Sequence, residues 1–410
     1  MTAQQFVLEL GRAMHALGSP AYRVEDTMDA CCRALGLEGS FFATPTAIFS
    51  AIGPAGATPQ TVLTRVAPGD HDLARLAALY AIRDRVVRGE RTPTEGLGDV
   101  RAVLAAAARG NAWLDLLAHT AAGAGAAVLF GGGGREAAVA ALAGAAVAAI
   151  GIAARRRPGL GDVQSALACL VVAFVAAAAA VAWPPVHAPI ATMAAIVVLL
   201  PGLSFTTALA ELSVRHLAAG SARLLGTLAV LLTMAIGIGL GDRLAALAFG
   251  PAPVAAPVRL GLGWCVLGLG ANWFAFVVLL RASWRQAPWV LAAMATGFGG
   301  ARLGSGWLGD ELGACVGALA VAALANLHAR GWRQPAATVR TPGLLLLVPG
   351  SLGLSGLTTA LTGDFASSAP FAFRMLLVGG AIVAGLLFAG VLVPPPLDVE
   401  PEARRRPSAR

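Results

Sequence analysis

From residue 112 onward, the chain consists of apolar runs that are each long enough to cross a lipid bilayer as a helix. A hydrocarbon core of about 30 Å requires roughly 20 predominantly apolar residues in helical form. Only 13% of the residues are charged, which excludes a soluble globular protein of ordinary composition. We therefore predict ten membrane-spanning helices, near residues 112–131, 136–154, 163–183, 189–210, 221–242, 257–281, 288–305, 309–329, 342–362 and 371–394.

The fourth and the ninth of these runs each contain a Pro-Gly pair, Pro201-Gly202 and Pro349-Gly350. Proline has no backbone N–H, so Pro201 leaves the carbonyl group of Val197 without its helical donor, and Pro349 does the same to Leu345. In hydrocarbon, such a carbonyl group must be satisfied by protein, water or a ligand. Paired interruptions in the corresponding helices of two halves are typical of a transporter's substrate site.

The two interrupted runs also predict how the membrane part is built. They are five spans apart, so the second copy must enter the membrane from the side opposite to the first. We expect an all-α polytopic membrane domain of ten helices in two inverted five-helix repeats, at residues 111–250 and 251–396, with a basic cytoplasmic tail at 397–410. Residues 244–258 are expected to link the two repeats.

Residues 1–110 predict a small α/β domain in front of the membrane part. They hold 11 Arg and 11 acidic residues, so the whole net charge of +8 belongs to the remainder of the chain. Two helices, near 2–17 and 21–36, are expected to precede three strands, at 40–43, 46–52 and 60–66. Asp70 is expected to cap a helix that ends near Arg88, and Thr92 and Glu95 predict a capping box for a helix that ends near residue 108.

The arginines predict the orientation of the spans, since every one of the 30 basic residues is Arg. If residues 1–110 lie in the cytoplasm, fourteen arginines fall in the inside loops and the tail, and five fall in the outside loops. This is the bias that the positive-inside rule requires. The first residues show no cleavable signal pattern. We therefore expect a multi-pass protein of the cell membrane, inner or plasma, with both termini in the cytoplasm.

Hydroxyl groups and one carboxylate group follow the Pro-Gly pairs closely enough to share a substrate site with them. The N-terminal amides of the two half-helices could bind a carboxylate group, and freed carbonyl groups or Glu211 could take an ammonium group. For Glu211 the alternative is an ion pair with Arg215, one turn further on, at the cytoplasmic end of the span. The candidate substrate-binding residues are Pro201, Gly202, Thr206, Thr207, Glu211, Pro349, Gly350, Ser351 and Ser355.

No motif predicts a catalytic, metal or cofactor site. The absence of lysine excludes a P-loop, a Schiff base and a lysine general base, and the five cysteines show no metal-ligand spacing. The glycine run 131–134 favours close packing in a turn over a phosphate loop. An enzyme acting through the N-terminal domain would have to use His15, His71, Asp70 or Asp72, but neither a nucleophile elbow nor an HExxH motif is present.

Four stretches of the chain resemble the threonine/serine exporter family. In the soluble part the resemblance covers residues 18–49, which begin GSPAYRVEDTMD, and residues 64–100. In the membrane part it covers residues 199–224, which begin LLPGLSFTTALAEL, and residues 325–357, which end RTPGLLLLVPGSLGLSGL. It therefore extends over essentially the whole chain. Members of this family are known as exporters of small amino acids driven by the proton motive force, and two-protein versions export a small dicarboxylate. The resemblance marks both Pro-Gly pairs, and Glu211 stands where the family often has Asp.

The resemblance implies a secondary transporter that exports threonine and serine from the cytoplasm, with the proton as coupling ion and no cofactor. The lipid bilayer and a small-molecule substrate are the expected partners, no nucleic acid is expected, and a homo-oligomer is left open. An exporter of a small dicarboxylate such as succinate is the main alternative. Glu211 would repel such a substrate, and no arginine is expected at mid-membrane.

Overall fold

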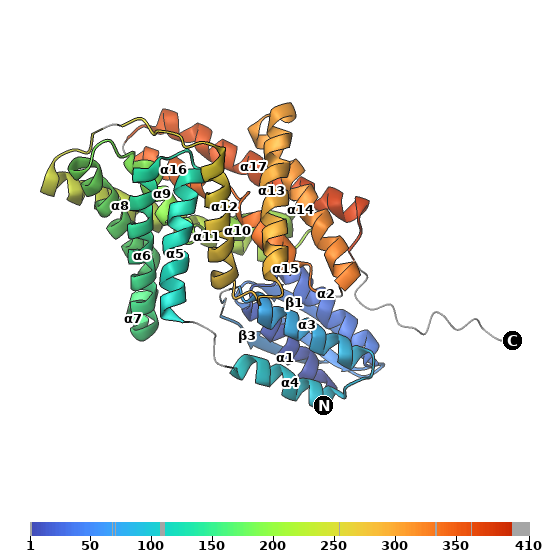
Figure 1. The fold of residues 1–410 in the computed structure, drawn as a ribbon. Coiled ribbons are helices and arrows are strands. Elements are labelled where there is room, and N and C mark those ends of the chain that lie inside the picture. The colour runs from blue at the N-terminus through green and yellow to red at the C-terminus, as the bar shows by residue number, and fades with distance from the viewer. Residues whose placement is uncertain are drawn as a thin grey trace.

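The fold consists of a small N-terminal domain attached to one end of a group of long helices (Figure 1). The computed structural model describes residues 2–67, 69, 71–106, 111–253, 255–332, 334–361 and 363–395, without the side chain of Pro158. The expected tail at 397–410 lies outside these residues, as does Asp70.

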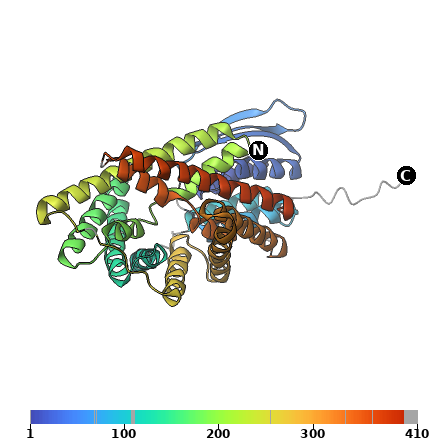
Figure 2. The same ribbon diagram turned by 90° about the horizontal axis from the view of Figure 1, so that it is seen from above.

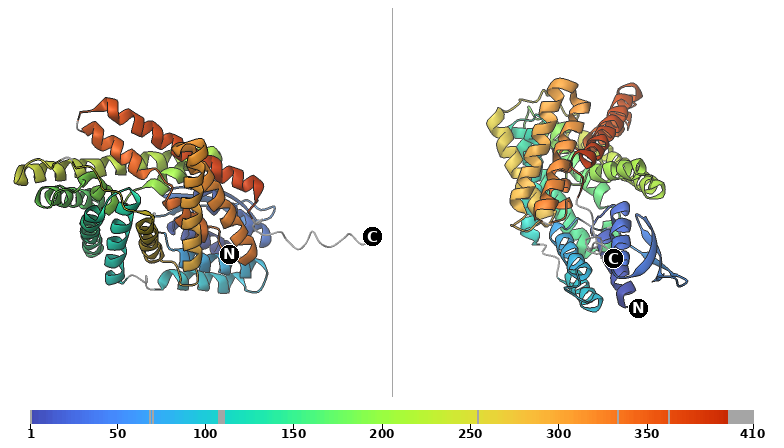
Figure 3. Two further views of the ribbon diagram at one scale, coloured as in Figure 1. Left: turned by 45° about the horizontal axis from the view of Figure 1, so that its top comes forward. Right: turned by 90° about the vertical axis from the view of Figure 1, so that its right-hand side faces the viewer.

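The N-terminal domain combines four helices with a three-stranded antiparallel sheet in the order β1-β2-β3. Helices α1 and α2 pack between the sheet on one side and α3 and α4 on the other (Figure 3). The core is apolar and includes Phe6, Leu10 and Met14 of α1 together with Met28 and Ile48. The elements are α1 (Thr2–Ala16), α2 (Ala21–Ala34), β1 (Leu37–Thr44), β2 (Ala47–Pro54), β3 (Gln60–Arg65), α3 (Leu73–Val87) and α4 (Pro93–Ala105).

The sequence predicted one of the two helix caps in this domain correctly and placed the other cap two residues too early. The capping box is present, because Thr92 accepts from the Glu95 amide and Glu95 accepts from the Thr92 amide. The cap of α3 is Asp72 and not Asp70: the Asp72 side chain accepts from the Arg75 amide at 2.9 Å. A capping carboxylate must directly precede the first helical residue to reach these amides, and Asp72 does so.

The remaining helices form two series. The first comprises α5 (Ala112–Leu129), α6 (Gly134–Arg156), α7 (Pro158–Gly161), α8 (Gln164–Ala182), α9 (Ala188–Ala195), α10 (Gly202–Ser213) and α11 (Leu217–Phe249). The second comprises α12 (Leu262–Leu279), α13 (Ala287–Leu308), α14 (Asp310–Trp332), α15 (Ala337–Leu345), α16 (Gly350–Leu361) and α17 (Phe365–Leu392). Among the described residues, eight segments are long and apolar enough to cross a membrane: α5, α6, α8, α11, α12, α14, α15 with α16, and α17.

The two series are joined by a shorter linker than the sequence predicted. Residues 244–249 continue α11 and do not belong to the linker, because none of these six residues is glycine or proline. Gly250 ends the helix with a positive φ of 86°, which favours glycine, and Pro251 follows it. Proline is common just after a helix end, because it cannot continue the helix.

Close approach of backbones holds the long helices together. A β-carbon added to Gly237 of α11 would lie 2.3 Å from the carbonyl oxygen of Ala166 in α8, and one added to Gly241 would lie 2.3 Å from that of Leu170. Membrane helices gain packing energy in this way, because lipid offers no hydrophobic driving force between them. The long helices α11 and α17 run obliquely across the upright helices, as the view from above shows (Figure 2).

Candidate functional site

The two helix breaks lie against each other. A β-carbon added to Gly202 would be 2.6 Å from Cγ2 of Val348 and 3.2 Å from the backbone nitrogen of Gly350. One added to Gly350 would be 3.1 Å from Cβ of Leu200 and 3.3 Å from Cα of Gly202. Each glycine thus faces the residue before the proline of the other break. A side chain at position 202 would therefore displace Val348, and one at position 350 would be in tight contact with the other break.

Both breaks start a half-helix of 12 residues, α10 and α16, at the point of contact. In the first turn of α10, the Phe205 amide donates a hydrogen bond to the Pro201 carbonyl group (3.0 Å). In the first turn of α16, the Gly353 amide donates to the Pro349 carbonyl group (3.2 Å). The amides before Phe205 and Gly353 have no acceptor within their own helix. Two helix N-termini, each with partial positive charge, therefore meet at one place.

This place borders a cavity of about 790 Å³, which we call the central cavity. Its lining comes from both series of helices and from the N-terminal domain, which contributes Gly69 and His71. Pro201, Pro349, Gly350 and Ser351 are the predicted site residues that line it. Gly202 is buried directly beside it, between the two breaks.

Several polar groups in the central cavity were not predicted as site residues. The Asp115 carboxylate group pairs with Arg155 at 2.8 Å, and the Asp115 carbonyl oxygen lies 2.7 Å from Nδ1 of His119. Asn272 donates to the Gly268 carbonyl group of its own helix at 2.9 Å. The spacing of Asp115 and His119 was a usable signal: two polar residues four apart share one helical face, and such residues in a membrane span indicate function by default.

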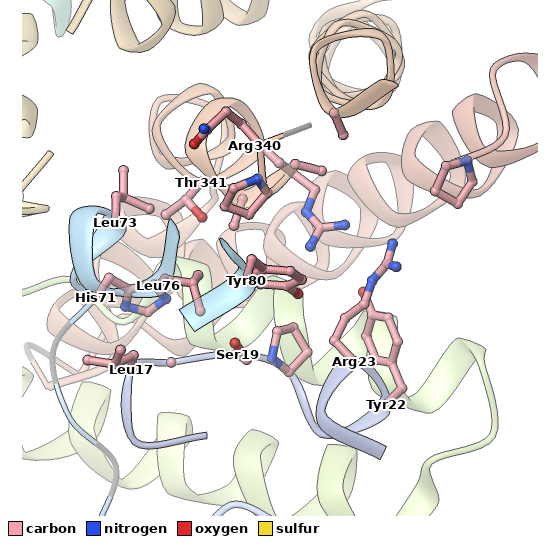
Figure 4. A pocket seen from close by; sticks show the side chains of 18 of the residues that line it. Leu17, Ser19, Tyr22, Arg23, His71, Leu73, Leu76, Tyr80, Arg340 and Thr341 are labelled. Carbon is pink, nitrogen blue, oxygen red and sulfur yellow. The ribbon is translucent and has the colours of Figure 1, made fainter. Parts of the chain in front are cut away.

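Four predicted residues, Thr206, Thr207, Ser355 and Glu211, lie apart from the central cavity. The Thr206 hydroxyl group donates to the Gly202 carbonyl group of its own helix at 3.1 Å. Thr206 and Thr207 line a second cavity of about 420 Å³, which we call the joint cavity, where α10 and α15 meet the N-terminal domain (Figure 4). Ser355 lines neither cavity, and its carbonyl group accepts from the hydroxyl groups of Thr358 and Thr359.

Glu211 is fully buried and is held by two protein partners. Its carboxylate group forms a bidentate pair with Arg223 of α11, at 2.9 and 3.0 Å. Oε1 also accepts from the Ala21 amide at 3.0 Å, at the N-terminus of α2. The expected alternative partner, Arg215, lies in the turn between α10 and α11 with φ 68°, and this turn brings α11 back so that Arg223 reaches the carboxylate group. Glu211 therefore joins the two domains, and Arg223 replaces Arg215 as its partner.

Further contacts fix the N-terminal domain to the membrane helices. The Leu73 amide donates to the Leu280 carbonyl group at 2.9 Å, and the Leu73 side chain packs in a cluster with Phe276 and Val290. On the other side of the domain, Glu25 lies 3.6 Å from Nδ1 of His216. Burial raises the pKa of Glu25, and the Ala43 amide and His216 offset this only in part. The domain thus closes one end of the central cavity.

His15 and Asp72, two of the residues considered for an enzymatic site, make structural contacts within the protein. Nε2 of His15 lies 2.7 Å from the Thr44 carbonyl oxygen, and Asp72 caps α3 and lies 3.8 Å from Arg281. His71 lines both cavities. Among the described residues, no group of three or more His, Cys, Asp or Glu side chains is arranged to hold a metal ion.

Two family models match the chain. One, described as a threonine/serine exporter, matches residues 5–245. The other, also described as a threonine/serine exporter, matches residues 265–392. The first match ends near the end of α11 and the second begins near the start of α12, so each covers one series of helices, and the first also includes the N-terminal domain.

Curated relatives from yeasts match nearly the whole chain at low identity. Pheromone-regulated membrane protein 10 of Saccharomyces cerevisiae is 25% identical, over 95% of this chain and 54% of the relative. The protein of that name from Candida albicans is 26% identical, over 96% of this chain and 38% of the relative. The one from Zygosaccharomyces rouxii is 24% identical, over 95% of this chain and 43% of the relative. The chain thus spans about half or less of the length of these relatives. No solved structure matches.

The Glu211 contacts predict that Glu211→Ala destabilises the protein. The substitution leaves a largely buried guanidinium group of Arg223 unpaired and removes the acceptor for the Ala21 amide, at a cost of about 3 kcal/mol. Thermal unfolding of the purified chain in detergent measures the effect. The control is Glu311→Ala, which breaks the Glu311–Arg374 pair of 2.7 Å. That pair is exposed, so little change is expected. Equal unfolding temperatures for the two variants would contradict the role assigned to Glu211.

Proposed function

Since the chain belongs to the threonine/serine exporter family, we propose that it is a secondary transporter that exports threonine and serine from the cytoplasm. In this proposal the proton motive force drives export, and the substrate binds in the central cavity at the two helix breaks. The observation that carries the proposal is the meeting of the N-termini of α10 and α16 at this cavity.

The geometry of the breaks suits an amino acid. Amides without helical acceptors, at the positive ends of two helices, favour a carboxylate group. The carbonyl groups of Val197 and Leu345 lose their helical donors because residues 201 and 349 are prolines, and they can accept from an ammonium group. Ser204 and Ser351 line the same cavity and can bond to a substrate hydroxyl group. We do not include Glu211, whose oxygens already have protein partners.

The charges around the central cavity favour a zwitterion over a dicarboxylate. Its lining includes two arginines, Arg155 and Arg281. Arg155 pairs with Asp115 at 2.8 Å, and Arg281 lies 3.8 Å from Asp72. A dicarboxylate would bring two negative charges next to cations that are already neutralised. A zwitterionic amino acid has no net charge and does not require unpaired positive charge in the cavity.

Several features support two inverted five-helix repeats with ten spans. Each series contains one broken helix whose second half has 12 residues, followed by a long helix, α11 or α17. Helix α8 packs on α11 as α14 packs on α17, and α10 and α16 each contact both long helices. The reciprocal contact of Gly202 with Val348 and of Gly350 with Leu200 is what a two-fold relation between the halves would produce. In this proposal α13 and the α9–α10 pair complete the ten spans.

We place both termini in the cytoplasm and the protein in the cell membrane. The end of α17 lies on the same side as the N-terminal domain, because Pro395 and Tyr22 line the joint cavity together. Arg155, Arg281 and Arg340 lie toward this side too, since each lines a cavity that the N-terminal domain helps to close. This agrees with the arginine bias that marks an inside face.

Restoring both helices should abolish export without loss of protein. In Pro201→Ala/Pro349→Ala, the new amides can bond to the Val197 and Leu345 carbonyl groups and withdraw them from the cavity, while membrane insertion stays normal. We expect wild-type abundance and no efflux of labelled threonine from proteoliposomes. The control is Pro370→Ala, in α17, which removes a helical proline that lines neither cavity and should keep transport. Wild-type export by the double variant would mean that the breaks are only packing kinks.

His119 is the residue we propose as proton carrier. Histidine is the side chain whose ordinary pKa lies closest to neutral pH, and His119 lines the central cavity near the Asp115–Arg155 pair. With Nδ1 bonded to the Asp115 carbonyl group, Nε2 can take up and release a proton.

His119→Gln should therefore separate binding from coupling. We expect exchange of labelled for unlabelled threonine to continue, and transport driven by an imposed pH gradient to stop. His187→Asn is the control, because His187 caps α9 outside the central cavity and Asn can replace it as a cap. Gradient-driven transport at the wild-type rate in His119→Gln would assign the coupling to another group.

A further inference from the structure

The joint cavity is a second space, with a lining unlike that of the central cavity. It lies where α2 and α3 of the N-terminal domain meet α10, α14 and α15, and its volume of about 420 Å³ is in the range of small-molecule sites. Leu203 and His71 line both cavities, so the two share part of their wall.

The lining of the joint cavity is basic. It includes one acidic residue, Asp84, and five arginines: Arg23, Arg83, Arg88, Arg330 and Arg340. Asp84 is already paired with Arg83 at 2.7 Å, and Arg88 pairs with Glu90 at 2.6 Å. Within the described part of the chain, Arg330 and Arg340 have no carboxylate partner. The cavity therefore keeps an excess of positive charge.

Two of these arginines come from different domains and converge. The guanidinium groups of Arg23, in α2, and Arg340, in α15, are directed into the same space beside the Tyr80 ring (Figure 4). An anion between them can accept paired N–H bonds from both, because the planar guanidinium group matches the geometry of carboxylate and phosphate groups.

We propose that the joint cavity binds a small soluble anion with two or more negative charges, of the phosphorylated or polycarboxylate class. The anion bridges Arg23 and Arg340 and so fastens the N-terminal domain to α15. The hydroxyl groups of Ser19 and Thr341, which line the same space, add donors. A soluble ligand is favoured over a lipid because α2 and α3 of the N-terminal domain form one wall.

The position of the site gives it a regulatory consequence. Thr206 and Thr207 of α10 and Thr341 of α15 line it, so an anion in this cavity lies beside both broken helices on the side of the N-terminal domain. A ligand that binds one arrangement of these half-helices better than another shifts the population toward it. This consequence rests on the proposed export activity, whereas the binding of the anion does not.

Inorganic pyrophosphate is a suitable probe for the full chain in phosphatidylcholine nanodiscs. A ligand that binds the folded state raises the unfolding temperature, so we expect a saturable rise that sodium chloride at equal ionic strength does not produce. Arg340→Gln should weaken the apparent affinity at least about tenfold, because a charge-assisted bond is lost. Arg243→Gln, an exposed change in the distant half of α11, should not alter it.

The same variant distinguishes a ligand site from a structural arginine. Without pyrophosphate, Arg340→Gln should unfold at or above the wild-type temperature, because it lowers the excess of positive charge in the cavity and breaks no ion pair of the described residues. A lower temperature would indicate a structural role and contradict the proposal.

Three other results would overturn it. One is the absence of a saturable shift in the wild-type protein. Another is a shift that requires phosphatidylglycerol in the nanodiscs, which would assign the site to a lipid headgroup. The third is uptake of labelled pyrophosphate by proteoliposomes, which would make the joint cavity part of the transport path. Failure to transport threonine would reject the proposed function but leave the binding measurement intact.

Discussion

The contact between two proline-interrupted helices is the constraint on which the rest of the membrane part depends. Pro201 and Pro349 remove backbone donors in a region where lipid cannot replace them, so the freed groups must face protein or a polar cavity. Gly202 and Gly350 let the breaks approach until a β-carbon would clash. The surrounding helices hold this contact between them: α11 and α17 each pack against both half-helices, α10 and α16.

The N-terminal domain completes the site from one end. Glu211 links the N-terminus of α2 to Arg223, and the Leu73–Leu280 backbone bond links the start of α3 to the end of α12. Gly69 and His71 then line the central cavity. A transporter that alternates between two openings would have to loosen some of these contacts when it opens toward this side. The joint cavity lies where such loosening would occur, so an anion bound there would act on the proposed export.

Local chemistry in the sequence predicted the breaks, the Thr92–Glu95 capping box and most of the apolar helices, because each depends on neighbouring residues. Contacts between distant segments were not predictable in the same way. The Glu211–Arg223 pair depends on the left-handed turn at Arg215, and Thr206 turns toward its own helix and the joint cavity. Asp115 and His119 were visible as a polar pair in an apolar run, but only the fold places them in the same cavity as the breaks.

The most direct test of the account is whether substrate occupies the space at the breaks. Ser351→Cys, in a chain whose native cysteines are replaced by alanine, puts a thiol group in the lining of the central cavity, and Ser367→Cys puts one at an exposed position of α17. The rate of maleimide alkylation is measured with and without threonine. The account predicts that threonine slows alkylation of Ser351→Cys and leaves that of Ser367→Cys unchanged. Equal rates at Ser351→Cys, at a threonine concentration that the same protein transports, would contradict it.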